Sequence, residues 1–171
     1  MKGKTSKESC ITLSQRVLPQ DANPAGNVHG GVILKYIDTA AGTVAMRHAR
    51  GNVVTASLDR MDFLAPVYVG ELVTFKACLN YVGTTSMEVG VRVEAENLFT
   101  GEVRYTNSAY LTFVALGENG RPTPIAPLIL ETEGEKRRWR EAKDRRKARM
   151  AEKARERCSQ EGGSECKSDG I

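Results

Sequence analysis

The sequence is poor in histidine and contains no long apolar run. Histidine occurs only at His29 and His48, and no cluster of potential ligands accompanies either, so we expect no metal site. No stretch approaches the ~20 apolar residues that a membrane-spanning helix needs, and we expect no membrane span. The N-terminal residues MKGKTSKESCITL also lack the apolar core of a secretory signal.

Cysteine is scarce and irregularly spaced. The four cysteines are Cys10, Cys78, Cys158 and Cys166, and none forms a CxxC pair. We therefore expect free thiols in a cytoplasmic protein, with neither a disulfide scaffold nor a zinc site. A cysteine nucleophile would need a histidine partner, and with two histidines in the chain this chemistry is not expected.

Positive charge is concentrated near the C-terminus. Residues 131–157 contain twelve Lys or Arg and seven Asp or Glu, a net charge of +5, whereas the whole chain has +4. The rest of the chain is therefore close to neutral. A basic segment of this kind can meet nucleic acid, anionic lipid or a phosphorylated ligand. A solvated helix face is the simpler interpretation, and no nucleic-acid partner is expected.

Hydrophobic periodicity predicts a strand, a helix and four further strands. Residues 9–18 alternate weakly up to Pro19, and residues 30–50 have a helical period that Gly51 and Asn52 are expected to end. The apolar face of the helix comprises Ile33, Ile37, Ala40, Ala41 and Val44. The later strands are expected at 53–62, 71–82, 86–96 and 103–116.

Residues 86–96 are the clearest strand. Met87, Val89, Val91, Val93 and Ala95 alternate with a polar set, Glu88, Arg92, Glu94 and Glu96. One buried face and one wet face indicate an antiparallel sheet. Because the apolar helix needs cover, we predict an α+β fold in which an antiparallel sheet of about five strands wraps one long central helix. Open sheet edges then favour pairing with a second copy.

The chain divides into four expected segments. Residues 1–8 are expected to be flexible, and residues 9–119 to form the domain. Residues 120–157 read as a proline-rich linker and a charged C-terminal helix, on which Trp139 docks one turn. Residues 158–171 are expected to be disordered.

A group of polar residues surrounds the start of the predicted helix. Asp38 borders the apolar face, and Gly42, one turn later, is expected to leave space beside it. Such a carboxylate suits a general base, although an ion pair with Lys35 or Arg47 is the ordinary alternative. His29, Gly30 and Gly31 open the helix, where free N–H groups can bind a carbonyl oxygen or phosphate. Asp21 and Asn23 precede them in a turn, where capping is the ordinary role.

Three stretches resemble a known family. DANPAGNVHGGVILKYIDTAAG, VVTASLDRMDFLAPVYVGE and SMEVGVRVEAEN are similar to the hotdog-fold acyl-CoA thioesterases, in particular the cytosolic acyl-CoA hydrolase group. The similarity extends from about Ile11 to Ala148 and includes the linker and the charged helix. The resemblance implies a hotdog fold, hydrolysis of fatty acyl-CoA, no cofactor other than the coenzyme A of the substrate, and at least a homodimer, with a trimer of dimers expected.

The resemblance also implies roles for individual residues. Asp38 matches the helix carboxylate that acts as base or nucleophile, Gly31 would present its N–H to the thioester oxygen, and Asn23 or Asp21 would position water. With one domain in this chain, two copies would share a site. The expected substrate-binding residues are His29, Gly30, Gly42, Thr55, Ser57, Arg60, Phe63 and Ser86, with Leu34 and Met61 also setting pocket depth. The cations expected near the CoA phosphates are Arg60, Arg92, Arg104 and the basic tail.

Two other functions fit the same fold. A hotdog dehydratase or hydratase would use a loop histidine with a helix acid, as His29 and Asp38 could, but the His-Phe-Pro type of loop is replaced here by His29-Gly30-Gly31. A non-catalytic acyl-CoA sensor would bind substrate without releasing thiol. Sequence alone leaves open the acyl length and the choice between Asn23 and Asp21.

Overall fold

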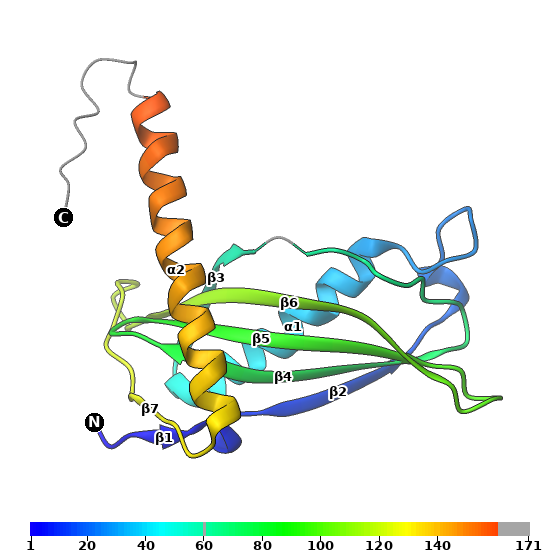
Figure 1. The fold of residues 1–171 in the computed structure, drawn as a ribbon, viewed down its shortest axis with the longest axis horizontal. Coiled ribbons are helices and arrows are strands. Elements are labelled where there is room, and N and C mark those ends of the chain that lie inside the picture. The colour runs from blue at the N-terminus through cyan, green and yellow to red at the C-terminus, as the bar shows by residue number, and fades with distance from the viewer. Residues whose placement is uncertain (60, 161–171) are drawn as a thin grey trace.

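A computed structural model describes residues 1–59 and 61–160 of the chain (Figure 1). Two α-helices, seven strands and two short 3₁₀ helices make up the described part. The helices are α1 (Gly30–Ala49) and α2 (Glu133–Gln160), and the 3₁₀ helices are η1 (Ser6–Glu8) and η2 (Pro19–Asp21). The strands are β1 (Lys4–Thr5), β2 (Ile11–Arg16), β3 (Asn52–Leu58), β4 (Leu72–Val82), β5 (Ser86–Glu96), β6 (Val103–Leu116) and β7 (Leu128–Ile129).

The main sheet has five antiparallel strands in the order β2-β4-β5-β6-β3. The bounds of β5 and β6 are those predicted from the sequence, because turn residues separate an alternating segment from one rich in Tyr, Thr, Phe and Val. β3 ends at Leu58, four residues short of its predicted end, and its pairing with β6 shifts register between Thr55 and Ser57. β2 and β3 therefore form the two edges of the sheet.

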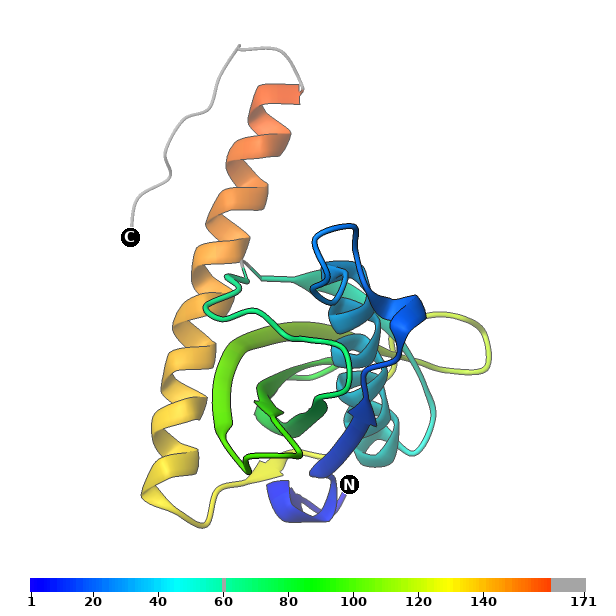
Figure 2. The same cartoon turned by 90° about the vertical axis from the view of Figure 1, so that its right-hand side faces the viewer.

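Helix α1 lies in the concave face of the curled sheet (Figure 2). All five residues predicted for its apolar face are buried, together with Ala45. They pack against the inward side chains of the long strands, among them Phe75, Val89, Leu111 and Phe113. The predicted α+β architecture, one long helix wrapped by an antiparallel sheet, is confirmed.

The end of α1 differs from the prediction in one detail. Arg50, not Gly51, adopts the left-handed conformation that ends the helix, with φ 55° and ψ 36°. Its N–H donates to the carbonyl of Met46, which satisfies one of the last carbonyls of the helix. A non-glycine residue is uncommon in this conformation. The glycine that was expected to end the helix lies one residue after the position that does so.

Helix α2 covers the opposite, convex face of the sheet, and its C-terminal half extends beyond the strands (Figures 1 and 2). Trp139 packs against Tyr81 of β4, as the expected one-turn contact requires. The helix runs to Gln160, so residues 158–160, predicted to be disordered, are helical, and residues 161–171 lie outside the described part. Within that part, no helix is long and apolar enough to cross a membrane.

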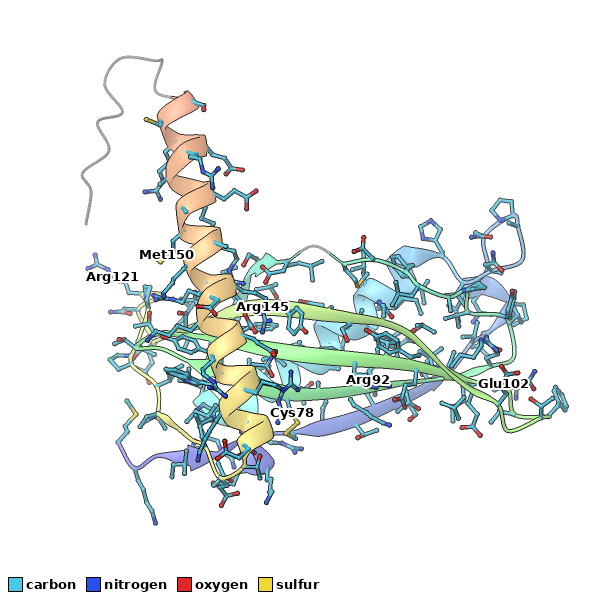
Figure 3. The ribbon with its side chains drawn as sticks, in the orientation of Figure 1. Cys78, Arg92, Glu102, Arg121, Arg145 and Met150 are labelled. Atoms are coloured by element: carbon cyan, nitrogen blue, oxygen red, sulfur yellow. A yellow bond between two sulfur atoms is a disulfide. The ribbon has the colours of Figure 1, made fainter. Side chains whose placement is uncertain are left out.

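Because α2 covers this face, one residue predicted to be wet is buried. Glu88 of β5 is 1% exposed and accepts hydrogen bonds from Arg145 of α2 at 2.7 Å and from Asn80 at 3.2 Å. Arg145, labelled on α2 in Figure 3, also stacks on Tyr110, with its guanidinium carbon 3.8 Å from the ring centre. Arg149 lies 3.5 Å from Glu88 and donates to Asp59 at 2.6 Å. These contacts fasten α2 to the sheet.

The N-terminal segment, residues 1–8, was predicted to be flexible and contains a short strand and a 3₁₀ helix. Lys4 and Thr5 form strand β1, which pairs in parallel with β7 in the proline-rich segment. Ser6 is buried and donates to the carbonyl of Leu79, while Ser9 contacts His48 Nδ1 at 3.4 Å. Polar composition suggested flexibility, but these long-range hydrogen bonds hold the segment to the domain.

The prediction of free thiols is wrong for one pair of cysteines. Cys10 and Cys78 form a disulfide between β2 and β4, with Cα atoms 4.4 Å apart. The register places them opposite each other, because the next pair along is Ile11 with Ala77. Their separation of 68 residues hides this pairing from any spacing rule. Cys158 lies near the end of α2, and Cys166 lies outside the described residues.

Candidate active site

A hydrogen bond joins Asp38 of α1 to Thr55 of β3 on the side of the sheet where α1 packs. The hydroxyl of Thr55 on β3 donates to Asp38 Oδ1 at 2.8 Å. Both residues are exposed in the single chain, so the carboxylate is less buried than the sequence suggested. Asp38 makes no ion pair with Lys35 or Arg47 among the described residues, so the ordinary alternative for a helical carboxylate is not what the structure has. One carboxylate oxygen is oriented by Thr55, and the other is left for a further partner.

The start of α1 carries the predicted carbonyl-binding N–H groups, but one of them has an internal partner. His29 is the N-cap residue, and its Nδ1 accepts the backbone N–H of Gly31 at 3.1 Å. Because that nitrogen accepts, the proton of a neutral His29 ring is on Nε2. The Gly31 N–H can bind a ligand oxygen only when the His29 ring moves away.

The two glycines next to His29 have different surroundings. A side chain on Gly30 would begin 3.4 Å from the ring of Phe63, so Phe63 lies directly over the first turn of α1. Phe63 is half exposed and belongs to the segment between β3 and β4. Leu64 attaches this segment to β6, since its N–H donates to the carbonyl of Thr106 at 2.9 Å.

Asn23 and Asp21 both make the local turn contacts that their sequence context suggested. Asn23 Oδ1 accepts the N–H groups of Ala25 at 2.9 Å and Asn27 at 3.3 Å. Asp21 Oδ2 accepts the N–H of Leu18 at 2.9 Å. The two residues differ in the groups left to bind a ligand. Asn23 lines a pocket, and its amide N–H₂ can donate to a ligand there. The Asp21 carboxylate caps η2 and does not line that pocket.

The pocket at the start of α1 has a volume of about 320 Å³ and a mainly apolar wall. Asn23, Gly30 and Phe63 line it, together with Asn27, Val28, Ile33, Leu64, Ala65, Pro66 and Val67. Asp38 is not among these lining residues, since it lies eight residues beyond Gly30, about 12 Å along the helix. In one chain, therefore, the pocket and the Asp38–Thr55 contact are separate.

Several other predicted site residues lie elsewhere. A side chain at Gly42 would meet the ring of Phe113 at 3.6 Å, an ordinary contact distance, so Phe113 borders the space beside this glycine. Ser57 and Ser86 line a pocket under α2 on the convex face. Thr55 is paired with the buried Phe113 and Ser57 with the adjacent Thr112, so the two β3 residues point to opposite faces. The predicted residue Arg60 lies outside the described residues.

Two cations expected near the CoA phosphates are engaged by carboxylates. Arg104 donates to both carboxylate oxygens of Glu71, at 2.8 and 2.9 Å. Arg92 donates to Glu94 at 2.7 Å, and the bonds from Lys76 and Arg92 hold the pKa of the Glu94 carboxyl below its usual range. Of the cations expected near the CoA phosphates, those of the basic C-terminal helix remain as candidates.

The sequence analysis named Thr55 and Asp38 but not the contact between them, and it missed the buried charges under α2. The Thr55–Asp38 contact depends on how β3 crosses α1, which no local pattern records. The contacts of Glu88 with Arg145 and of Asp59 with Arg149 join residues 57 and 90 positions apart. A glutamate within an alternating apolar strand, with an arginine-rich helix downstream, is the available signal, but it does not identify the pairs.

Comparisons with known proteins agree with this architecture. Residues 25–99 match the model of the thioesterase superfamily. The chain is 43% identical over 129 residues to an uncharacterized acyl-CoA thioester hydrolase of Bacillus subtilis, which covers 75% of each chain. It is 39% identical to the cytosolic acyl coenzyme A thioester hydrolase of Rattus norvegicus, over 82% of this chain and 38% of that one.

Solved structures are similar over nearly the whole chain. A hexameric acyl-CoA thioesterase superposes with a TM-score of 0.86 at 39% identity, covering 90% of this chain and 99% of that one. An acyl-CoA hydrolase of Staphylococcus aureus, in complex with butyryl coenzyme A, coenzyme A and coenzyme A disulfide, superposes with a TM-score of 0.85 at 35% identity, covering 92% and 96%. Its alanine variants at an aspartate, an asparagine and a threonine have also been solved.

Proposed function

The chain belongs to the thioesterase superfamily and is an acyl-CoA thioester hydrolase, and from this premise we propose which of its residues carry out the hydrolysis. Asp38 is the general base. Its carboxylate takes a proton from a water molecule, and the water oxygen attacks the thioester carbonyl carbon. The tetrahedral intermediate then collapses, the C–S bond breaks, and the proton passes from Asp38 to the CoA thiolate, leaving free acid and CoA.

The observation that carries this proposal is the hydrogen bond from Thr55 to Asp38 Oδ1 at 2.8 Å. It leaves Oδ2 free to hold water and fixes the direction in which that oxygen points. A base must be held in a productive direction, because small misplacements of a reacting group cost large factors in rate. Thr55 is therefore an orienting residue, and Asp38 the group that meets water.

The oxyanion is stabilised by the backbone N–H of Gly31 at the positive end of α1. In the free protein His29 Nδ1 accepts this N–H at 3.1 Å. The thioester oxygen must therefore displace the His29 ring as it binds. Because the ring is exposed, it can rotate into solvent without breaking core packing.

Asn23 is the second polar residue of the reaction, in preference to Asp21. Support comes from the Staphylococcus aureus variants: along that chain the aspartate follows the asparagine by 15 residues, and the threonine follows the aspartate by 17. Asn23, Asp38 and Thr55 have the same two spacings. The free amide N–H₂ of Asn23 faces the pocket, where it can position water or the substrate carbonyl.

Two copies of the chain complete the site. The pocket with Asn23 and the contact of Asp38 with Thr55 are separate within one chain, and a second copy brings the Asn23 of one subunit to the Asp38 of the other. The open edge strand β3 carries Thr55 and exposes Val54 and Leu58, 42% and 43% accessible, so it is the expected pairing edge. A homodimer is the minimum unit, and a trimer of dimers agrees with the hexameric relative.

The acyl chain lies against the apolar wall of the pocket of about 320 Å³ beneath Phe63. Coenzyme A enters as part of the substrate, and the hydrolysis uses no other cofactor. We assign the protein to the cytoplasm, as for the relative named cytosolic acyl coenzyme A thioester hydrolase.

A thiol-release assay across acyl-CoA chain lengths tests the reaction, with native mass measured on the same sample. Asp38→Asn is expected to lower kcat by about a hundredfold or more while the protein remains folded. Full activity in this variant would exclude Asp38 as the base. Hydration of a crotonyl thioester without thiol release would instead indicate a hydratase, and tight binding without either product would indicate a sensor.

A further inference from the structure

The pocket under α2 on the convex face gathers polar groups that have no partner. Its volume is about 230 Å³, and its lining includes Ser57, Ser86, Arg146 and Lys153. Neither hydroxyl has a hydrogen-bond partner, and neither cation has an ion-pair partner, within residues 1–59 and 61–160. Only an aromatic contact is available to Arg146, whose guanidinium carbon is 5.9 Å from the ring centre of Tyr81.

The acidic residue that lines this pocket is already neutralised. Glu88, at its floor, accepts from Arg145 at 2.7 Å and lies 3.5 Å from Arg149. Arg149 in turn donates to Asp59 at 2.6 Å. Two carboxylates and two guanidinium groups thus balance, and the charges of Arg146 and Lys153 remain in excess.

This pocket differs from an adjoining hollow in the acidic residues that line it. An adjoining hollow of about 620 Å³ shares Ser57, Arg149 and Lys153, but its lining also contains Glu152 and Glu156. The smaller pocket contains Arg146 in place of these glutamates, and Glu88 is its sole acidic lining residue in the described part. An anion is therefore attracted to the Arg146 side.

We propose that this pocket binds a phosphate group, held by Arg146 and Lys153 and by the hydroxyls of Ser57 and Ser86. Lysine and arginine with hydroxyl donors are a favourable set for phosphate oxygens, and charge-assisted hydrogen bonds are the strong ones. At about 230 Å³ the pocket is smaller than most sites for drug-sized ligands and suits one phosphate group with its waters.

The position of the pocket connects it to the hydrolytic site. Ser57 lies in the pocket on one face of β3, and Thr55, two residues earlier, orients Asp38 on the other face. The register shift of β3 lies between these two residues. The phosphate belongs either to the coenzyme A of the substrate or to a separate phosphorylated ligand. Phosphate binding itself does not depend on the proposed hydrolysis, whereas the assignment to substrate rests on it.

The first arm of the test measures binding without turnover. Thermal unfolding of the full chain is followed in sodium phosphate and in sodium chloride of equal ionic strength. The double variant Arg146→Gln, Lys153→Gln is compared with Arg140→Gln, which removes an exposed arginine of α2 outside the pocket. We expect phosphate to raise the Tm of the wild type and of Arg140→Gln, and to bind about tenfold more weakly, or worse, to the double variant.

The second arm identifies the source of the phosphate. KM is measured for an acyl-CoA and for the same acyl group on pantetheine, which carries no phosphate. The pocket is assigned to the substrate if the double variant, but not Arg140→Gln, raises KM about tenfold for acyl-CoA and leaves KM for acyl-pantetheine unchanged. Unchanged KM values beside a lost phosphate effect on Tm assign it to a separate ligand. If both arms show no difference between the double variant and Arg140→Gln, the proposal is overturned. A wild type without thioesterase activity would contradict the proposed hydrolysis and leave the first arm valid.

Discussion

The backbone N–H of Gly31 donates to Nδ1 of His29 at 3.1 Å, so the N-cap of α1 engages the group that we propose binds the thioester oxygen. A capping contact normally stabilises a helix by about 1 kcal/mol. Under the proposed mechanism the same contact competes with substrate. The stability of the helix and the availability of the Gly31 N–H are then opposed at one residue.

Replacement of His29 separates these two effects. His29→Ala is expected to lower the free energy of unfolding by about 1 kcal/mol while kcat is kept or increased, because the Gly31 N–H becomes free. His29→Asn is the matched control, since asparagine also caps helices and continues to compete for the N–H. Denaturant unfolding and steady-state hydrolysis measure the pair. A loss of turnover in His29→Ala as large as that of Asp38→Asn would mean that His29 takes part directly.

Thr55 is expected to act through Asp38. Thr55→Val removes the hydrogen bond to Oδ1 and should reduce kcat by roughly ten- to a hundredfold, with KM little changed, because the carboxylate loses its direction. Thr55→Ser keeps the hydroxyl and should recover most of the activity. Equal activity in the valine and serine variants would show that the hydroxyl has no orienting role.

The contact of Glu88 with Arg145 is expected to be important for the attachment of α2. Their side chains are 2% and 24% exposed, and Glu88→Gln would leave Arg145 without its charged partner in a largely buried position. We expect a loss of about 3 kcal/mol in the free energy of unfolding. The control is Glu141→Gln, whose pair with Arg137 is exposed and worth less than about 1 kcal/mol. Urea unfolding compares them, and equal losses would contradict the assignment.

His48 is expected to make stability depend on pH. It is fully buried, its Nε2 is 2.8 Å from the carbonyl of Ala126, and burial lowers its pKa from 6.5 despite that hydrogen bond. The unfolded chain therefore binds the proton more readily than the folded one. The contribution of neutral His48 is complete above pH 6.5 and is lost as the pH falls from there through the lower folded pKa.

Unfolding midpoints measured between neutral and mildly acidic pH check this prediction. The midpoint should fall as the pH drops, and His48→Gln, which cannot titrate, should reduce the slope. If that variant folds poorly, proton uptake on unfolding of the wild type, measured by calorimetry in two buffers, gives the same information. Absence of uptake would contradict the prediction.

The elements that sequence predicted best are those whose signal is local. Residues 86–96 alternate, residues 103–116 are rich in Tyr, Thr, Phe and Val, and residues 30–50 keep one apolar face, so the strands, the helix and the two-layer arrangement followed. Asp38 stood out because it borders that face.

What sequence missed depends on contacts between distant segments. Glu88 was expected in water because its strand alternates, but whether α2 covers that face is decided by tertiary packing. Cys10 and Cys78 were expected to be free because they form no CxxC pair. Their pairing follows from the register of β2 on β4, which the sequence does not record. Gly42 was expected to clear space, and the ring of Phe113 borders that space at contact distance.

The disulfide between Cys10 and Cys78 has a consequence for hydrogen exchange. β2 is an edge strand, and edge strands ordinarily open locally ahead of the rest of a sheet. With a covalent link to β4, the start of β2 cannot separate from the sheet unless β4 moves with it. Amide protons in the two strands should therefore exchange as one cooperative unit in the oxidised protein, whereas reduction should let β2 exchange on its own.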